Sequence, residues 1–361
     1  MPQTELKRIV RLMATLLCSL LCPLSSVAIG DDSLGTVTIT NLTVPLSDMM
    51  SPEARAYMTH LLVDHPFAGG PRADQDIKGY RVRQDEIMRT FLDPMLARYA
   101  VTHGERTIGG VVTDYVSPAT GVARRNAHRV LINLHGGGFL SGARTAALVE
   151  SVPIASLMKI PVISVDYRLA PEAHFPAASE DVAAVYKELL KQFKPSQIGI
   201  YGCSAGGILA AESIAWFESH KLPLPAAVGV LCASLGEDFS AGDSGIITWQ
   251  LNGFPQPPKG TMGFFRSGYF EGVSEGNPLA RPVYSPALLA KFPPTIFLTA
   301  TRSMEFSAAV HSHNALLQVG VKAELNVWDG LPHAFMYNSN LPESRQAYEI
   351  LVKFFDEHLS R

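Results

Sequence analysis

Charge and cysteine are both scarce in this 361-residue sequence. Only 17% of the residues are charged, and 30 Lys and Arg stand against 33 Asp and Glu, which gives a formal net charge of −3. Without a basic excess the chain has no evident means of neutralising a phosphate backbone, so we expect no nucleic-acid partner. A hydrophobic content of 47% excludes a disordered chain, because it supplies ample apolar surface for a buried core.

The four cysteines are too few and too far apart for a disulfide scaffold or a zinc site. Cys18 and Cys22 lie in an N-terminal segment that we expect to be removed, which leaves Cys203 and Cys232. There is no Cys-x-x-Cys motif and no Cys/His spacing typical of metal binding, so no metal site is expected. Both remaining cysteines follow predicted strands. We expect two buried free thiols, with a bridge between them as the alternative.

The N-terminal residues 1–28 have the three parts of a secretory signal peptide. A basic start precedes an apolar run at 12–22, and small residues at 26–28 suit a signal peptidase. The run is shorter than the roughly 20 residues of a membrane-spanning helix, so we predict cleavage near Ala28 and a periplasmic or secreted protein without stable membrane insertion. An N-terminal anchor is the alternative, and a lipoprotein is a poorer match because bulky leucines precede Cys22.

From about residue 106 short apolar runs alternate with helical patterns. This alternation is typical of an α/β protein with a mostly parallel central sheet and helices on both faces. We predict strands at about 129–134, 161–165, 198–201, 226–232, 295–299 and 324–328, and helices at about 145–158, 178–193, 206–220, 305–319 and 343–358.

Two further segments are predicted to form a helical cap over the active-site end of the sheet. Helical patterns at 51–63 and 85–99 place N-terminal cap helices within residues 29–105, and the catalytic domain then spans 106–361. Residues 236–282 break the alternation and are rich in Gly, Ser, Pro and aromatics. An insertion there would lie beyond the carboxyl ends of the strands, where ligands bind. We predict a lid, with an irregular surface excursion as the alternative.

The strongest motif runs from Gly202 to Gly206 and reads Gly-Cys-Ser-Ala-Gly. It follows a predicted strand and begins a predicted helix, which is the context in which G-x-S-x-G exposes a serine nucleophile. Glycines on either side leave room for the sharp turn, and the helix N-terminus favours negative charge that develops beside Ser204. A glycine-rich helix start capped by a serine is the alternative.

A second glycine-rich motif, His135–Phe139, follows the strand at 129–134. An oxyanion hole would form from the backbone amide groups of Gly137, Gly138 and Ala205. In one variant of this prediction the amide of Gly136 also takes part. His135 precedes the glycines, so we assign it a structural role in this loop. The base is predicted to be His333, which lies after the last predicted strand and is the only histidine in the position that α/β-hydrolases use.

These motifs together resemble the bacterial hormone-sensitive-lipase-type (family IV) esterases of the α/β-hydrolase superfamily. The matching segments are 135–139, Asp166–Glu172, Gly202–Gly207 and Leu331–Phe335, and the resemblance covers about residues 106–361. It implies hydrolysis of carboxylic esters with short to medium acyl chains, without a cofactor. The near-neutral net charge suits a small, uncharged ester, and a homodimer is left open. It also implies that Asp166 and Arg168 tie the oxyanion loop to the nucleophile region by charged hydrogen bonds.

The sequence departs from the family pattern at two positions. Cys203 stands where members often have an acid before the serine, which is expected to remove a charge beneath the nucleophile. Ser303 stands where similar sequences have the Asp that orients the histidine. Glu305 follows two residues later and reaches one methylene further, so we predict it as the acid. Alternatively, Glu305 is only an acid in the first turn of the next helix, where the helix dipole favours it. Glu237 or Asp238 would then be the acid that orients the histidine.

The sequence therefore predicts a carboxylic-ester hydrolase that acts through Ser204, His333 and Glu305. A non-catalytic ligand-binding homologue is one alternative, favoured only by the altered acid position. An amidase or peptidase on the same fold is another, because the same residues cleave both bonds.

Overall fold

The computed structural model describes residues 43–64, 76–239, 242–253 and 268–360, together with the backbone of two short strands before them. The chain divides into two compact units, 1–45 and 46–361. In the first, β1 (Val27–Ile29) pairs antiparallel with β2 (Val37–Ile39). The predicted signal peptide lies outside the described residues except at its last two positions.

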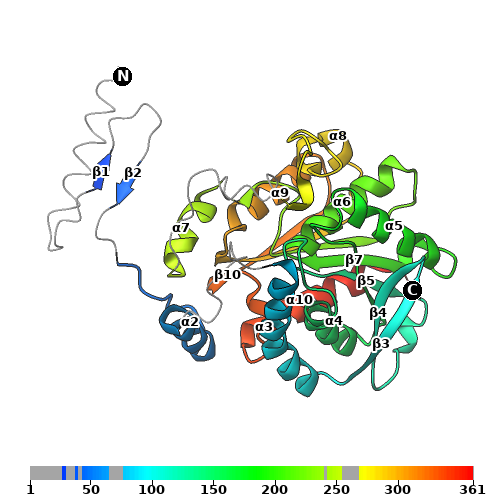
Figure 1. The fold of residues 1–361 in the computed structure, drawn as a ribbon, viewed down its shortest axis with the longest axis horizontal. Coiled ribbons are helices and arrows are strands. Elements are labelled where there is room, and N and C mark those ends of the chain that lie inside the picture. The colour runs from blue at the N-terminus through cyan, green and yellow to red at the C-terminus, as the bar shows by residue number, and fades with distance from the viewer. Residues whose placement is uncertain are drawn as a thin grey trace. The chain divides into compact units, whose positions relative to one another are not determined.

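The second unit is built around an eight-stranded sheet (Figure 1). The strand order is β10-β9-β8-β7-β5-β6-β4-β3. Neighbours are parallel except at β4, which runs antiparallel to both β3 and β6. The predicted mostly parallel sheet is therefore confirmed. The strands are β3 (Val101–Ile108), β4 (Val111–Pro118), β5 (Val130–Leu134), β6 (Val162–Val165), β7 (Ile198–Cys203), β8 (Ala227–Leu231), β9 (Thr295–Arg302) and β10 (Ala323–Pro332).

Helices cover both faces of this sheet, as predicted. One layer contains α5 (Ala177–Leu189), α6 (Ala205–Ser219) and α9 (Phe306–Gln318), whose buried side chains share one hydrophobic cluster. The other contains α4 (Thr145–Met158) and α10 (Pro342–His358), which contribute to a second cluster. As drawn in Figure 1, the first layer lies above the sheet and the second below it. Burial on both faces explains why the central strands read as continuous apolar runs.

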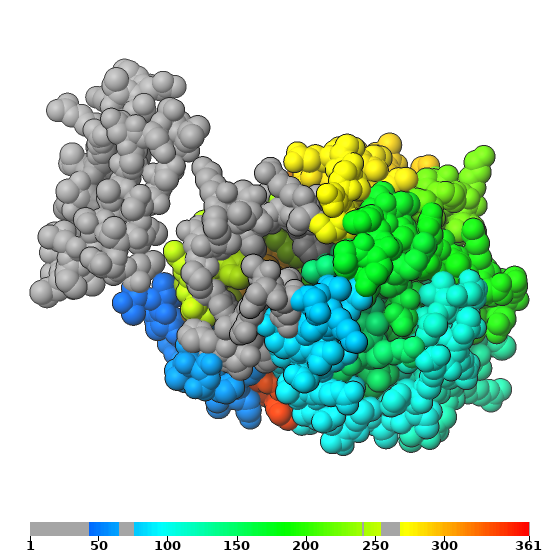
Figure 2. All heavy atoms as spheres, viewed as in Figure 1, coloured from blue at the N-terminus to red at the C-terminus, as the bar shows by residue number. Residues whose placement is uncertain are grey.

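Two N-terminal helices, α2 (Pro52–Asp64) and α3 (Ile77–Arg98), pack onto the second cluster through Met58, Leu92 and Met95. The structure starts α3 eight residues before the predicted residue 85, because Asp76 caps it by accepting a hydrogen bond from the Gly79 amide at 2.6 Å. In Figure 2 the azure atoms of α3 lie against green atoms from the middle of the chain. Two shorter helices are α7 (Asp243–Leu251), within the predicted lid segment, and α8 (Pro286–Leu289).

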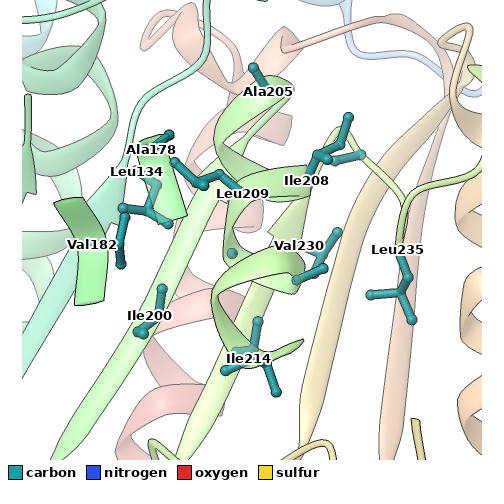
Figure 3. Close-up of a cluster of buried hydrophobic side chains, with 14 of the residues drawn as sticks. Leu134, Ala178, Val182, Ile200, Ala205, Ile208, Leu209, Ile214, Val230 and Leu235 are labelled. Carbon is teal, nitrogen blue, oxygen red and sulfur yellow. The ribbon is translucent and has the colours of Figure 1, made fainter. Parts of the chain in front are cut away.

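The hydrophobic cluster between the sheet and the layer of α5, α6 and α9 fixes the position of α6 relative to β7 and β8, the strands that precede and follow it. Figure 3 shows Ile200 of β7 and Val230 of β8 beside the buried side chains of α6, Ile208 and Ile214 among them. Each is fully buried, and burial of one such side chain contributes about 1.5–3 kcal/mol. This packing holds the start of α6 rigidly at the end of β7. Among the described residues no helix combines the length and apolar character needed to cross a membrane.

One buried group in this core makes folding stability depend on pH. Glu212 of α6 is fully buried, and its carboxylate oxygens have no hydrogen-bond partner among the described residues. Burial raises the pKa of Glu212 well above its ordinary value of 4.5. The folded protein therefore binds this proton more tightly than the unfolded chain, so stability falls as pH rises above about 4.5.

We expect Glu212→Gln to remove this dependence, because glutamine does not ionise. Its Tm should exceed that of the wild type by about 2–8 °C at pH 8 and by much less at pH 5. Thermal unfolding of both proteins across this pH range measures the difference. An equal Tm shift at both pH values would contradict the buried, protonated Glu212.

Candidate active site

Ser204 lies at the sharp turn between β7 and α6, in the predicted strand–turn–helix context. Its backbone has φ 58° and ψ −123°, a region that residues other than glycine rarely occupy and that is associated with functional strain. The Ser204 amide donates to the Leu231 carbonyl of β8 at 2.8 Å, which anchors the turn to the neighbouring strand. Cys203 and Ala205 on either side are fully buried, whereas Ser204 is partly exposed. The turn therefore presents only the serine hydroxyl.

The glycines of this turn are required by close backbone contact. A Cβ atom on Gly206 would lie 1.7 Å from the Leu134 carbonyl oxygen, and one on Gly202 would lie 2.2 Å from the same atom. No side chain fits at either distance, since real Cβ atoms stay beyond about 3 Å of such oxygens. The predicted steric reason for both glycines is confirmed. The contact also brings the end of β5, where the second motif begins, directly against the nucleophile turn.

The loop after β5 has an unusual run of positive φ angles at Gly137 (119°), Gly138 (64°) and Phe139 (59°). No described residue accepts a hydrogen bond from the amides of Gly137, Gly138 or Ala205. These three N–H groups are free to bind a ligand anion. Gly136 is not, because its amide donates to the Glu150 carboxylate at 2.8 Å. The variant of the prediction that included Gly136 among the oxyanion donors is wrong for this reason.

His135 has the structural surroundings expected of it. It is fully buried, its Nδ1 donates to the Gly136 carbonyl at 2.8 Å, and burial lowers its pKa to about 4. The ring stacks on Tyr167 with centroids 4.3 Å apart, and the Tyr167 hydroxyl donates to the His135 carbonyl at 2.6 Å. The Ala170 amide adds a 2.8 Å hydrogen bond to the Phe139 carbonyl. The loop is thus braced at both ends by the segment after β6.

The residues expected to provide this bracing were Asp166 and Arg168, and that prediction is wrong. Arg168 turns away to α5, where its Nε lies 3.0 Å from the Asp181 carboxylate. Asp166 faces Arg144 at 3.5 Å, and neither side chain contacts the nucleophile turn. Both belong to partly exposed ion pairs, whereas the neighbouring Tyr167 points inward and does the bracing. An alternation of inward and outward side chains explains why the middle residue is the important one.

His333 follows directly after β10, and its Nδ1 lies 2.8 Å from the Glu305 carboxylate. Glu305 is fully buried and also accepts hydrogen bonds from Thr299 at 3.0 Å and Ser303 at 2.5 Å. Burial alone would raise the pKa of Glu305, but the charge of His333 and the hydrogen bonds of His333 and Ser303 together lower it below its ordinary value. The carboxylate is therefore ionised beside the imidazole. Ser303, in the usual acid position, supports this acid.

Two other carboxylates, the alternative candidate Glu237 and the nearby Asp329, have their hydrogen-bond partners elsewhere. Glu237 accepts hydrogen bonds from His311 at 2.8 Å and from Ser312 at 2.7 Å, both on α9. Asp329 accepts from Thr301 at 2.9 Å on the neighbouring strand. Neither contact involves His333, so the structure brings Glu305, and not these acids, to the imidazole.

Glu150 of α4 is a site residue that the sequence analysis missed. Its fully buried carboxylate accepts hydrogen bonds from Asn133 and Gly136, each at 2.8 Å, from the Cys203 amide at 3.3 Å and from Tyr337 at 2.5 Å. Cys203 itself is a neutral buried thiol, and the carboxyl group of Glu150, from another helix, lies against its backbone amide. One feature of the sequence could have indicated this residue: Glu150 is the only charged residue in the predicted helix 145–158.

The two predicted free thiols, Cys203 and Cys232, are both free and buried. Cys232 lies close to the acid and base, so that its sulfur, a Glu305 oxygen and a His333 nitrogen fall within 4.8 Å of one another. These atom types could hold a metal ion. The Glu305 oxygen and the His333 nitrogen, however, already bind each other at 2.8 Å, which is the arrangement that acid–base chemistry requires.

Comparison with known proteins agrees with this geometry. Residues 131–337 match a family model described as the alpha/beta hydrolase fold. An acetyl-hydrolase of Streptomyces hygroscopicus is 28% identical over 250 residues, which is 69% of this chain and 80% of the relative. An esterase of Acinetobacter venetianus is 25% identical and covers 64% of this chain and 76% of its own length.

Solved esterase structures share the architecture over most of the chain. The crystal structure of esterase E25 has 28% identity and a TM-score of 0.78, and the match covers 90% of this chain and 99% of that one. An esterase from the bacterial hormone-sensitive lipase family has 25% identity and a TM-score of 0.72, covering 86% and 99%. This chain therefore belongs to the α/β-hydrolase-fold family, and it is similar to esterases, one of which comes from the bacterial hormone-sensitive lipase family.

Proposed function

We propose that this enzyme hydrolyses short- to medium-chain carboxylic esters through an acyl-enzyme on Ser204. His333 acts as the base and Glu305 as the acid that orients it. The observation that carries the proposal is the 2.8 Å contact between His333 and the buried, ionised Glu305. It supplies the acid that the usual position, occupied by Ser303, lacks. The one feature that favoured a non-catalytic protein is thereby accounted for.

In the acylation half-reaction, the Ser204 oxygen attacks the ester carbonyl. The Nδ1 atom of His333 is engaged by Glu305, so Nε2 is the ring nitrogen left to take the serine proton. The carbonyl oxygen becomes an anion as the tetrahedral intermediate forms. The unpaired amides of Gly137, Gly138 and Ala205 donate hydrogen bonds to it, and each such donor contributes about 3–4 kcal/mol.

The intermediate collapses when His333 returns its proton to the leaving alcohol oxygen, which breaks the ester bond and leaves the acyl group on Ser204. Water then attacks the acyl carbon while His333 takes a proton from it, and the carboxylic acid leaves as the proton returns to Ser204. The Glu305 charge stabilises the imidazolium in both half-reactions.

We further propose that α2 and α3 form part of a cap beside this site. Residues 240–241 and 254–267 of the predicted lid lie outside the described residues. Supporting contacts come from Arg81 of α3, which donates to the Leu140 carbonyl of the oxyanion loop at 2.7 Å and to the Ala170 carbonyl at 3.0 Å. Through these bonds the position of α3 is coupled to the loop that would bind the oxyanion.

The substrate class is tested by a series of p-nitrophenyl esters from acetate to palmitate. We expect kcat/KM to be highest between acetate and octanoate and to be lower by at least about tenfold for palmitate, because an acyl pocket of limited depth cannot bury further methylenes. An optimum at palmitate would contradict the proposed chain length. Faster cleavage of matched p-nitroanilides than of the esters would instead support the amidase alternative.

A further inference from the structure

We propose that Glu150 is a positioning residue of this reaction, whose carboxylate holds the oxyanion loop and the nucleophile turn in their working arrangement. The inference rests on the proposed function of Ser204 and adds to it a residue from a helix outside the catalytic motifs. Three separate parts of the chain donate hydrogen bonds to this single side chain.

Each of the two carboxylate oxygens accepts two of these hydrogen bonds. Oε1 accepts from the Gly136 amide at 2.8 Å and from the Tyr337 hydroxyl at 2.5 Å, so it joins the oxyanion loop to the segment after His333. Oε2 accepts from the Asn133 amide group at 2.8 Å and from the Cys203 backbone amide at 3.3 Å. It therefore joins the end of β5 to the residue before the nucleophile.

These anchor points lie next to the reacting groups. Gly136 precedes the oxyanion donor Gly137, and Cys203 precedes Ser204. A Cβ atom on Gly136 would lie only 3.4 Å from the Ser204 Cβ, which shows how closely the loop approaches the turn. Because oxyanion donors act only when they meet the developing charge at about 2.7–3.1 Å, a small shift of the loop weakens them.

A carboxylate suits this place better than any neutral side chain. All four partners are hydrogen-bond donors, and an ionised carboxylate accepts without donating. Glutamine would turn its NH₂ group toward at least one donor and leave it unpaired. Only the ionised form of Glu150 can accept hydrogen bonds from all four donors at once.

Stability alone does not account for this residue. Glu150 is fully buried, and its described hydrogen bonds include none from Lys, Arg or His. Burial raises its pKa to about 7 even though Tyr337, Asn133 and the Gly136 and Cys203 amides act in the opposite direction. A buried charge without a countercharge is costly, and apolar replacements of buried ionic groups are often neutral or stabilising. Its presence as the only charged residue of α4 points to a role in the reaction.

The test compares Glu150→Gln with Tyr337→Phe, which removes one donor to Oε1, and with Glu212→Gln as the control. Glu212 is also a fully buried carboxylate, but its oxygens accept no hydrogen bond from the oxyanion loop or the nucleophile turn among the described residues. Diethyl p-nitrophenyl phosphate titrates reactive Ser204, so that kcat can be expressed per active site, and thermal unfolding reports on the fold.

For Glu150→Gln we expect kcat with p-nitrophenyl butyrate to fall about 10- to 100-fold while KM changes less than about threefold. The rate of phosphorylation of Ser204 should fall in parallel. Tyr337→Phe should lower kcat about 3- to 10-fold, and Glu212→Gln should leave kcat unchanged. A purely structural role would lower the titratable fraction or the Tm without changing kcat per site.

The proposal is overturned if folded Glu150→Gln keeps its kcat within twofold of the wild type. If that variant does not fold, Tyr337→Phe decides, and an unchanged kcat then overturns the proposal. Failure of the proposed function is distinguishable, because in that case the wild type itself would not be phosphorylated on Ser204.

Discussion

Replacing Ser204 by Ala is expected to lower kcat/KM for p-nitrophenyl butyrate by about 10⁴–10⁶-fold. The reason is that the serine oxygen forms the covalent bond to the acyl group, and no neighbouring side chain can take its place. Cys203 and Ala205 on either side are fully buried. What activity remains would come from the oxyanion donors and binding alone.

Steady-state kinetics on purified protein measures this effect, with Ser213→Ala as the matched control. Ser213 lies two turns further along α6, where its hydroxyl donates to the Leu209 carbonyl at 2.6 Å. Its replacement should change kcat/KM by less than about twofold. A Ser204→Ala enzyme that retains more than one hundredth of the wild-type rate would contradict the assigned nucleophile.

Replacing Glu305 by Gln is expected to lower kcat by about 10³–10⁴-fold. The amide carries no charge to stabilise the imidazolium, and it can present a donor to His333 Nδ1 and so favour the wrong tautomer. Ser303→Ala should lower kcat by no more than about tenfold, because it removes one hydrogen bond to the acid and leaves the charge in place.

Glu237→Gln is the control for loss of a buried carboxylate near α9. Glu237 binds Ser312 and His311 and makes no described contact with His333, so near-wild-type kcat is expected. If Glu305→Gln folds normally and keeps its kcat, or if Ser303→Ala proves the more damaging change, the acid has been assigned to the wrong residue.

The fold was predictable wherever burial leaves a pattern in the sequence. Five of the six predicted strands are buried and carry apolar runs. The sixth, β10, lies at the edge of the sheet and was predicted from a weaker, alternating pattern. The hairpin of β3 and β4 was missed because β3 is almost entirely exposed and its sequence, VTHGERTI, has no apolar run. β4 pairs with β6 and leaves β3 as the edge strand of the sheet, an arrangement that local sequence does not encode.

The site was predictable where a motif is local, and less so where distant segments meet. Ser204 and the oxyanion glycines each lie in one short motif after one strand. Glu305 was predicted from the reach of its side chain. Glu150 was not, because its partners lie between 14 and 187 residues away and only the packing of α4 brings them together. Arg168 was misassigned because its guanidinium forms an ion pair with the nearby Asp181 of α5 instead of reaching the oxyanion loop.

The central claim is that Ser204 forms the covalent intermediate, and the most direct measurement is mass spectrometry of the protein after reaction with diethyl p-nitrophenyl phosphate. We predict one diethyl phosphate group per chain, released p-nitrophenol in equal amount, complete loss of esterase activity, and peptide mapping of the label to Ser204. A label on any other residue, or an unlabelled protein that still hydrolyses esters and resists the reagent, would contradict the account.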